Sequence, residues 1–398
     1  MKKNNLRNTL KEYCTGCGLC KAVNGVIINV DKKGFGSPQL SDKDLHLCSL
    51  VCPASGFATR NYLDGTIWGK YKRSVLAWSN DEDIRFRASS GGIITALCLF
   101  LIREHLVDGI ISTCKHPDDF RCTLTRVNHT EQELLECMGS RYTTSAPLTD
   151  ILNLIKGNET YAFVGKPCDV SSLRIYIDHV NPEIGKSVKY LFSFFCAGQP
   201  SLVANNQLLT ALDVGDLKDC DDFQYRGNGW PGNVVLTFKN GTTSTMEYEK
   251  AWMSILGRDV KKICRYCADG TGELADISCG DAWYLSDKGK PVFDDKPGRN
   301  IVFLRTKEGA DLFDKLIDSN DVSALDCDVD KVLLKQMQPY HYTRKSSLSA
   351  YKMAQRVCGK RFPLYDNAIL RQFSKGFSLK QLILRFCGTI YRILKGSL

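Results

Sequence analysis

Cysteine carries the clearest chemical signal in this chain. A C-x2-C-x2-C run near the N-terminus is followed by a distant Cys-Pro, and the cysteines concerned are Cys14, Cys17, Cys20 and Cys52. A loop with the triple spacing wraps one face of an iron–sulfur cubane, and a Cys-Pro usually supplies the fourth thiolate. Zinc is the alternative, but zinc sites usually present pairs of C-x2-C. The spacing therefore predicts a 4Fe-4S centre with these four ligands.

The same segment resembles the two-cluster ferredoxins of bacteria, in which C-x2-C-x2-C-x3-C-P occurs twice and the fourth cysteine of each run serves the other cluster. Three positions of the doubled pattern lack cysteine and hold Asn24, Asp42 and Leu45. With this crossed arrangement, Asn24, Asp42 and Leu45 all stand at ligand positions of the same cluster. That cluster would retain Cys48 as its single cysteine ligand. We therefore expect a ferredoxin-like module with one cluster, in which Cys48 is a buried thiol.

A second set of cysteines indicates another site of the same kind. Cys264 and Cys267 form a C-x2-C pair that needs two further ligands. Cys168 and Cys196 each follow an expected strand, and ligands gather at the carboxyl ends of strands in open α/β sheets. We expect these four cysteines to hold a second 4Fe-4S cluster, with Cys279 as an alternative ligand. A zinc ribbon is the competing interpretation.

A glycine pair at the expected start of a helix could bind an anion. The run Arg87-Ala-Ser-Ser-Gly-Gly-Ile-Ile-Thr-Ala-Leu97 would leave backbone N–H groups open at the positive end of the helix dipole, which suits a pyrophosphate. The simpler alternative is that Ser89 or Ser90 caps a core helix.

Five short motifs follow one another along most of the chain, from Cys14 to about Trp283: SSGG-x2-TAL, GSRY, VGKPC, FFCAG and CxxCAD…ADISCGD. Together they resemble the beta-subunit family of coenzyme F420 (deazaflavin) hydrogenases and dehydrogenases, which includes formate dehydrogenase beta subunits and a chlorophyll reductase. The resemblance implies a flavin, normally FAD, beside a 4Fe-4S centre. It places the flavin at Ser89, Ser90, Gly91, Gly92, Thr95, Gly139, Ser140, Arg141, Tyr142, Gly165, Lys166 and Pro167.

Four charged residues in these motifs have two interpretations each. Arg141 and Lys166 would balance the charge of the flavin phosphates, and the alternative for both is an ordinary solvated cation. Asp269 and Asp281 could contact a ligand or turn loops by side-chain capping.

These cofactors predict an iron–sulfur flavoprotein oxidoreductase. A flavin exchanges electrons in pairs and a cluster exchanges them singly, so the chain would connect a deazaflavin or other organic substrate to one-electron 4Fe-4S carriers. The expected partner is ferredoxin or another redox protein. Some bacterial relatives occur in polysaccharide biosynthesis, which is one setting for the reaction. The alternatives are a non-catalytic iron–sulfur adaptor without flavin and a zinc-stabilised binding module.

Hydrophobic residues make up 43% of the 398 positions and charged residues 24%, which is typical of a globular chain. Residues 13–56 show little helical periodicity. Later segments alternate between expected strands (74–79, 107–113, 161–164, 188–195) and helices (92–104, 169–178), which indicates an α/β fold. Asn240-Gly241 predicts a hairpin between 234–239 and 243–248, and residues 258–300 are expected to be mostly loop.

We therefore expect a multidomain protein of the α+β or α/β class. Its expected parts are a ferredoxin-like module (1–65), the N-terminal part of an α/β domain (66–155), a flavin and iron–sulfur domain with an antiparallel insertion (156–342) and a basic helical tail (343–398).

The net charge of +9 is concentrated in this tail. Residues 343–398 contain 12 Lys or Arg and one acid, a net charge of +11, which leaves −2 for the rest of the chain. No nucleic-acid partner is therefore expected. Residues 379–395 project as a basic amphipathic helix, which could contact an anionic membrane surface or dock on the body or a partner, the commoner outcome.

The location follows from what the sequence lacks. A polar N-terminus without a signal peptide predicts a cytoplasmic protein, peripheral at the inner face of the membrane if the tail binds there.

Overall fold

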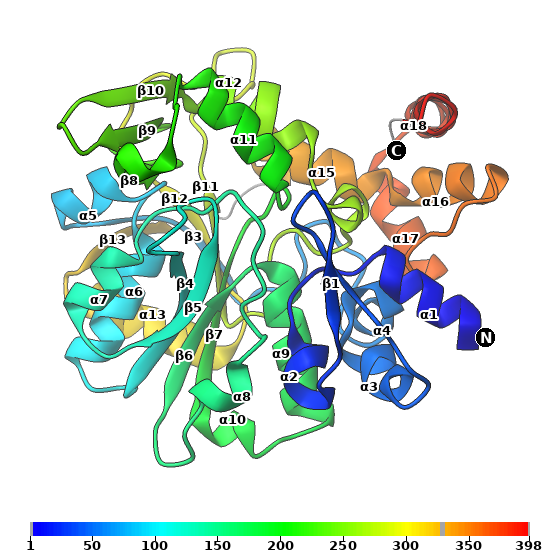
Figure 1. The fold of residues 1–398 in the computed structure, drawn as a ribbon, viewed down its shortest axis with the longest axis horizontal. Helices are drawn as coiled ribbons and strands as arrows, with labels where there is room; N and C mark the ends of the chain where they lie inside the picture. Colours follow the sequence, from blue (N-terminus) through cyan, green and yellow to red (C-terminus); the bar gives the residue numbers. More distant parts are fainter. Residues whose placement is uncertain (1–2, 327–330, 397–398) are drawn as a thin grey trace.

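An eight-stranded mixed sheet forms the centre of the computed structural model, which describes residues 3–326 and 331–396 (Figure 1). The ends of the expected module and tail, residues 1–2 and 397–398, lie outside the described residues. From one edge to the other the strands are β13 (Val322–Asp326), β3 (Arg73–Ser79), β12 (Asn300–Leu304), β11 (Ile277–Asp281), β7 (Val188–Phe194), β6 (Tyr161–Gly165), β4 (Gly109–Lys115) and β5 (Thr123–Asn128).

Strands β4, β6, β7 and β11 run parallel, while β3 pairs antiparallel with β12, which pairs antiparallel with β11. The carboxyl ends of β3, β4, β6, β7 and β11 therefore lie at the same edge of the sheet, and that of β12 lies at the opposite edge. This edge receives the segments that follow β3, β6, β7 and β11, which contain most of the motifs found in the sequence. Strands from both expected parts of the α/β region, 66–155 and 156–342, belong to this one sheet.

Helices cover both faces of the sheet because its central strands are apolar on both sides. Ile110 and Ile111, neighbours on β4, point to opposite faces. Ile110 belongs to a core shared with α6 and α13, and Ile111 to a core shared with α9. The helices associated with the sheet are α5 (Glu82–Arg87), α6 (Ile93–Arg103), α7 (Glu131–Glu136), α8 (Ile151–Leu154), α9 (Pro167–His179), α10 (Ile184–Ser187) and α13 (Lys307–Asp318).

The N-terminal module packs beside α9 and shares its core with it (Figure 1). Leu10 and Val51 of the module contact the same cluster as Leu173 of α9. Its elements are α1 (Lys3–Glu12), α2 (Leu19–Asn24), β1 (Ile28–Val30), β2 (Gly36–Pro38), α3 (Asp44–Val51), a 3-10 turn (Pro53–Ser55) and α4 (Phe57–Asn61). Helices α2 and α3 form despite the weak periodicity because burial against the α/β domain stabilises them.

A three-stranded antiparallel sheet confirms the expected insertion. Strands β8 (Cys220–Gln224), β9 (Asn233–Phe238) and β10 (Thr243–Glu247) pair in the order β10-β9-β8. The Asn240-Gly241 turn joins β9 to β10. Gly241 has φ +81°, which glycine adopts without strain. Around this sheet lie α11 (Leu202–Ala211), α12 (Tyr248–Lys250), a π-helical turn (Ala251–Ile255) and 3-10 turns (Leu217–Asp219, Leu256–Arg258).

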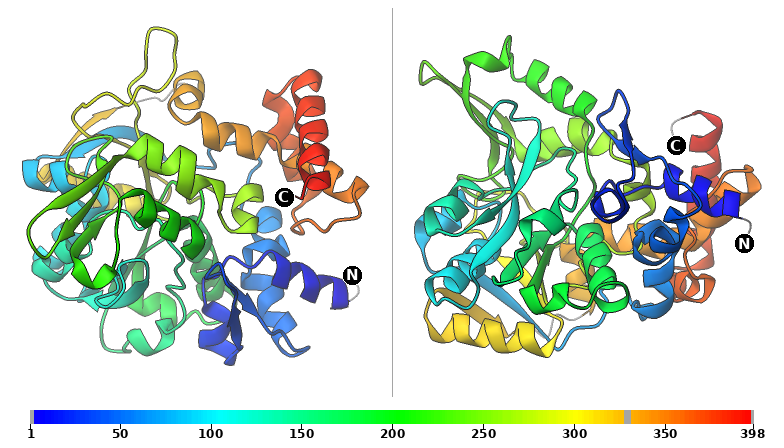
Figure 2. Two further views of the ribbon diagram at one scale, coloured as in Figure 1. Left: turned by 45° about the horizontal axis from the view of Figure 1, so that its top comes forward. Right: turned by 60° about the horizontal axis from the view of Figure 1, so that its bottom comes forward.

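The C-terminal segment is helical, as expected, and extends away from the sheet beside the N-terminal module (Figure 2). Its elements are α14 (Lys331–Met337), α15 (Pro339–Ser346), α16 (Leu348–Val357), α17 (Asn367–Phe373), a 3-10 turn (Ser374–Gly376) and α18 (Leu379–Leu394). We refer to residues 339–396 as the C-terminal extension. Among the described residues, no helix has the length and apolar character needed to cross a membrane.

The expected strands and helices are confirmed with shifts of one or a few residues. The main error concerns residues 258–300, where β11 is a central strand rather than loop. Its sequence, Ile-Ser-Cys-Gly-Asp, has low strand propensity after its first residue, and neighbouring strands on both sides stabilise it.

Candidate functional site

The first group of cysteines lines one cavity of about 430 Å³ between the N-terminal module and the α/β domain. The loop before α2, the first turn of α2, the second half of α3 and the residue after α3 bring together Cys14, Cys17, Cys20, Cys48 and Cys52. Gly18 turns this loop with φ +92°, and a Cβ there would lie 2.7 Å from the backbone nitrogen of Thr149. The cysteine loop is therefore pressed directly against the α/β domain.

Backbone N–H groups are directed at the sulfurs of this group. The N–H of Gly16 donates to Cys14 Sγ at 3.3 Å. Burial raises the pKa of Cys14 and Cys52, while N–H groups two residues further along the chain, from Gly16 and Ala54, act to lower it. Such N–H donors stabilise sulfur in the thiolate form, which is the form that binds metal.

Cys48 lies closer to this group than an unrelated buried thiol would. A hydrogen bond from Cys48 lowers the pKa of Cys20, and the same bond, followed by burial, raises the pKa of Cys48. The structure thus places a fifth thiol beside the four predicted ligands, as a hydrogen-bond donor to one of them.

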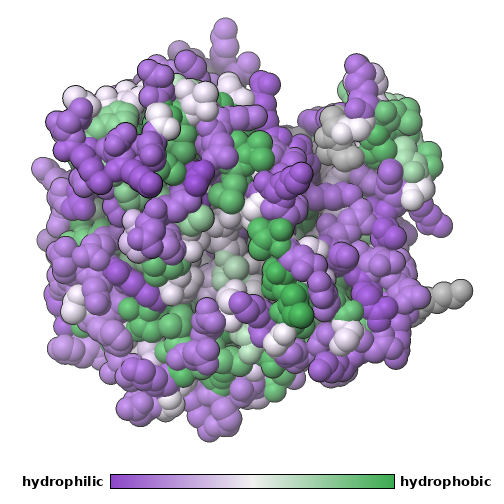
Figure 3. Space-filling view, viewed as in Figure 1, coloured by the Kyte–Doolittle hydropathy of each residue, from purple (hydrophilic) through white to green (hydrophobic). Residues whose placement is uncertain are grey.

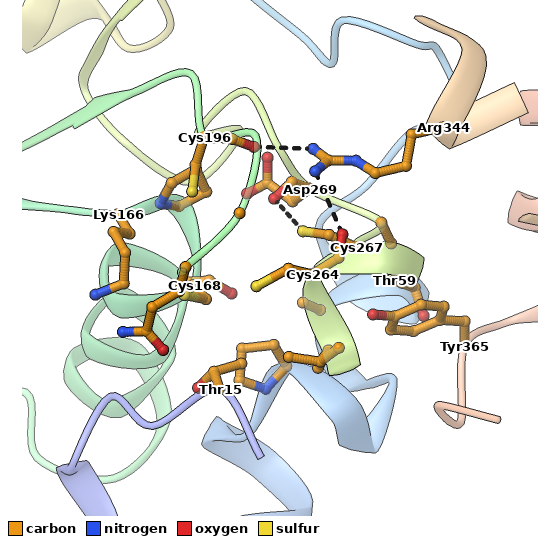
Figure 4. Close-up of a pocket in the computed structure, with 18 of the residues that line it drawn as sticks. Thr15, Thr59, Lys166, Cys168, Cys196, Cys264, Cys267, Asp269, Arg344 and Tyr365 are labelled. Carbon is orange, nitrogen blue, oxygen red and sulfur yellow. Dashed lines mark hydrogen bonds between the residues drawn. The ribbon is translucent and has the colours of Figure 1, made fainter. Parts of the chain in front are cut away.

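The second group of cysteines lines a separate, small cavity of about 50 Å³, shown in Figure 4. Cys168 begins α9 after β6, and Cys196 follows β7. Cys264 and Cys267 come from a 3-10 helix (Lys262–Tyr266) and the residue after it. Cys279 is absent from this lining; it lies on β11 beside Cys98. The four residues predicted first are therefore the ones that come together.

Burial raises the pKa of all four thiols of the second group, to about 11 for Cys196 and Cys267. Backbone N–H groups oppose this rise at three of them, and two of these donors again lie two residues further along, Gly198 for Cys196 and Asp269 for Cys267. In both cysteine groups, therefore, a backbone N–H two residues after a cysteine acts to lower the pKa of its thiol.

Arg344 of α15 reaches the second group from the C-terminal extension (Figure 4). Its guanidinium donates to the carbonyl oxygens of Cys196 at 3.0 Å, Ala197 at 3.1 Å and Cys264 at 3.4 Å. Burial acts to lower the pKa of Arg344, but Tyr340 and the nearby thiols raise it above its usual value. This role could not be predicted from sequence, because Arg344 is one of twelve basic residues in 343–398.

A larger cavity, of about 520 Å³, lies at the carboxyl edge of the sheet next to the second group. Of the positions predicted for flavin, its lining contains Ser89, Ser90, Gly92, Thr95, Gly139, Ser140, Arg141, Tyr142, Gly165 and Lys166. Gly91 lies behind the wall, where a Cβ would come within 2.8 Å of Ala77 O. Pro167 lines the small cavity of the second cysteine group instead.

Neither serine caps α6, so the simpler interpretation of this motif is wrong. The N-cap is Gly92, with φ +80° and no side-chain cap. Ser89 Oγ accepts the N–H of Ser140 at 2.8 Å, and Ser90 Oγ donates to the carbonyl of Arg299 at 2.9 Å. Ser89 therefore joins two of the motifs, Ser90 bonds the residue before β12, and the start of α6 faces the cavity without a side-chain cap.

Arg141 and Lys166 have different electrostatic surroundings. Lys166 pairs with buried Asp169 at 2.7 Å, so its charge is already balanced within the protein. Arg141 donates to the carbonyl of Phe223 at 3.2 Å, and its Nε is buried without a partner among the described residues. No carboxylate of the described chain forms an ion pair with Arg141, and burial lowers its pKa. Among the described residues, Arg141 is therefore a buried cation of this cavity that forms no ion pair.

Aromatic side chains form another wall of the large cavity, and its lining includes Tyr142, Tyr248, Trp252 and Trp283. Arg226 lies between them: its guanidinium is 4.4 Å from the ring centroid of Tyr248 and forms two bonds to Asp281, at 2.9 and 3.1 Å. Asp281 therefore pairs with an arginine. Asp269, by contrast, accepts backbone N–H groups of residues 271–273 and turns its loop.

Gln199 lines all three cavities, which therefore adjoin one another. Thr15 lines the cavities of both cysteine groups, and Cys196 lines both the cavity of the second group and the large cavity. Within the described residues, no group of His, Cys, Asp or Glu is arranged around a single metal ion. In a cubane each cysteine binds a different iron atom, so its ligands surround a wider space than those of one zinc ion.

Comparisons with known proteins identify relatives over most of the α/β domain. Residues 74–153 match the family described as "Coenzyme F420 hydrogenase/dehydrogenase, beta subunit N-term", and residues 158–329 match the corresponding C-terminal family. The chain is 24% identical over 286 residues to the coenzyme F420 hydrogenase subunit beta of Methanococcus voltae, covering 70% of this chain and 92% of that protein.

Two further comparisons extend this result. The F420-dependent formate dehydrogenase subunit beta of Methanocaldococcus jannaschii is 25% identical over 59% of this chain and 60% of its own length. A chain of the F420-reducing [NiFe] hydrogenase complex of Methanosarcina barkeri has the same fold, with a TM-score of 0.54, 21% identity and coverage of 75% of this chain and 98% of that chain.

Proposed function

The chain belongs to the coenzyme F420 hydrogenase/dehydrogenase beta-subunit family, and we propose that it is an iron–sulfur flavoprotein oxidoreductase with two 4Fe-4S clusters and one FAD. The observation that carries the proposal is that three cavities lie next to one another, with Gln199 in the lining of all three. Two of them contain the cysteine groups, and the lining of the third includes Arg141, which forms no ion pair among the described residues. The family resemblance and the geometry of this chain support the same assignment independently.

The donor sets fit iron–sulfur clusters. Cys14, Cys17, Cys20 and Cys52 would hold the first cluster, and Cys168, Cys196, Cys264 and Cys267 the second. Burial raises the pKa of every thiol in both sets except Cys20, so these thiols are protonated without metal. Most of them have a backbone N–H nearby that would donate to the thiolate when a metal replaces the proton. In the second group Arg344 adds a full positive charge.

The large cavity fits a flavin. Its volume of about 520 Å³ lies in the range of about 300–1,000 Å³ that is usual for cofactor sites. Arg141 and the start of α6 would hold the phosphates, since both offer donors without an anionic partner. The aromatic wall with Tyr248 and Trp283 would pack against flat rings. Lys166 keeps Asp169 paired, so its role is to position the start of α9 beside Cys168.

Bound at these sites, the flavin would supply two-electron exchange and the clusters one-electron exchange. The chain places the sites side by side: the large cavity shares Cys196 with the second cysteine group, and Ser145 and Gln199 with the cavity of the first. The first group lies in the module that packs outside the α/β domain, so it is the exit towards a partner. Thr15 and Gln199 line the cavities of both cysteine groups.

The organic substrate is proposed from the relatives, several of which are named for coenzyme F420. We propose a deazaflavin or a similar flat, anionic molecule, with a ferredoxin or another redox protein as the partner. The setting in polysaccharide biosynthesis stays a prediction from the resemblance. The competing function is an adaptor that holds clusters but no flavin.

Anaerobic reduction distinguishes the two functions. We expect reduced coenzyme F420 to bleach the visible absorption of the purified protein and to produce the EPR signals of reduced clusters. Heat denaturation should then release flavin, detected by its fluorescence. Bleaching by dithionite without flavin release would identify an adaptor and contradict the proposal.

A further inference from the structure

Helix α18 has apolar side chains on two sides, and only one side is covered. The covered strip packs against α16 and consists of Leu382, Phe386, Thr389 and Ile393. Thr389 is fully buried, and the other three are half-buried. Along this strip α18 therefore packs on another helix of the C-terminal extension, while docking of α18 on the rest of the chain stays a prediction.

The second strip is open. Its residues are spaced by four, four, four and three positions, so they lie on one side of the helix: Leu379, Ile383, Cys387, Tyr391 and Leu394. Leu379 is 74% exposed and Leu394 is 78% exposed. Figure 2 shows α18 at the outer margin of the molecule, and Figure 3 shows apolar side chains gathered over it. Single exposed apolar residues are common, but an ordered strip of them indicates a binding surface.

Positive charge accompanies the open strip at both ends of α18. Lys380 in its first turn and Lys395 at its C-cap are exposed, and neither forms an ion pair among the described residues. The ammonium group of Lys395 lies 4.9 Å from the ring centroid of Tyr391. The one acid of residues 343–398, Asp366, is occupied in capping the start of α17. The surface is therefore apolar with a rim of unbalanced cations.

We propose that the open strip of α18 binds the surface of a bilayer rich in anionic lipids, with the helix lying in the plane of the membrane. Apolar side chains would enter the interfacial region while the lysines contact phosphate groups. At 16 residues, with three cations, α18 is shorter and more polar than the roughly 20 apolar residues that a spanning helix needs.

Charge favours this occupant over a protein. A second copy would oppose two extensions that each carry +11 over residues 343–398, which would repel. Lysine is depleted in protein interfaces, whereas exposed lysines lie at both ends of this helix. Anionic headgroups complement both features. The proposal does not depend on which cofactors the chain holds.

Vesicle flotation of the full-length, anaerobically purified protein tests the proposal. We expect the protein to float with vesicles of equal parts phosphatidylglycerol and phosphatidylcholine at about 0.1 M salt, and binding to fall at about 0.5 M salt because the charges are screened. Vesicles of phosphatidylcholine alone should bind at least tenfold less protein.

Matched variants distinguish binding through the open strip from nonspecific adsorption to vesicles. Ile383→Gln together with Leu394→Gln should reduce binding at least tenfold, and Lys380→Glu with Lys395→Glu should do the same. Val30→Gln, at a residue of the N-terminal module that is 67% exposed, should leave binding unchanged. Circular dichroism must show unchanged helix content in each variant. Equal binding to both vesicle types, equal loss in the Val30 variant, or a stable dimer without vesicle binding would overturn the proposal.

Discussion

The guanidinium of Arg344 donates a 3.0 Å hydrogen bond to the carbonyl of Cys196, a residue 148 positions earlier in the chain. Arg344 lies in α15, beyond the segment matched by the family, and Cys196 follows β7, a central strand of the sheet. The C-terminal extension therefore completes the second cysteine site. The charge of Arg344 is the part of this site that the family motifs do not contain.

Arg344→Gln tests this contribution. We expect a loss of stability of about 3 kcal/mol, since several hydrogen bonds to a buried charge disappear. The reduction potential of the second cluster should become more negative, because removing a nearby positive charge disfavours the added electron. Potentiometric EPR titration measures this shift. The exposed Arg356→Gln of α16 is the control, and an unchanged potential in the Arg344 variant would refute the role.

The two cysteine groups should lose iron independently. Cys14→Ala and Cys264→Ala should each lower the iron content from about eight to about four per chain while flavin remains. Cys48→Ala and Cys279→Ala are matched controls at buried thiols outside the proposed ligand sets, and they should retain about eight iron. Colorimetric iron and sulfide assays give the result, and loss of iron in the Cys279 variant instead of the Cys264 variant would reassign the second site.

Arg141→Gln should weaken flavin binding without affecting iron. Losing a hydrogen bond between a charged guanidinium and a phosphate costs about 2 kcal/mol, which corresponds to roughly 30-fold weaker binding. Flavin fluorescence during dilution of the protein measures the dissociation constant. Arg121→Gln removes an arginine that pairs with Asp119 outside the cavity and should not change it. Unaltered flavin affinity in the Arg141 variant would exclude this residue from the site.

The buried imidazole of His341 should make the free energy of unfolding depend on pH in a specific way. Burial, with Arg344 next to it, holds the pKa of His341 well below the model-peptide value of 6.5. Below pH 6.5 the unfolded chain takes up a proton that the folded chain does not, so stability falls by about 1.4 kcal/mol per pH unit.

His341→Gln should remove this part of the slope between pH 6.5 and 5.5, whereas His179→Gln, at an exposed residue, should leave it. Thermal unfolding midpoints of the variants and the wild type across this range show the difference. Parallel curves for the His341 variant and the wild type would contradict the assignment.

Local sequence was sufficient to predict the parts of the site that lie within one strand–turn–helix unit. Cys168 and Cys196 follow apolar strands, and parallel strands end at one edge, so their meeting could be expected. The same holds for Asn240-Gly241, whose turn is determined by those two residues.

Contacts between distant segments could not be predicted in this way. The prediction that Ser89 caps a helix is wrong because its Oγ accepts the N–H of Ser140, 51 residues away. The prediction that Lys166 balances a phosphate does not account for its pairing with Asp169. Strand β11 has a loop-like composition and is stabilised by its neighbours β7 and β12. Each of these depends on tertiary contacts that periodicity and composition do not encode.

The central claim is that one chain holds two clusters and a flavin side by side. The most direct test is the iron, acid-labile sulfide and flavin content of the wild-type protein purified without oxygen. The account predicts about eight iron, about eight sulfide and about one flavin per chain. A colourless preparation that contains zinc and no iron, or four iron without flavin, would contradict it.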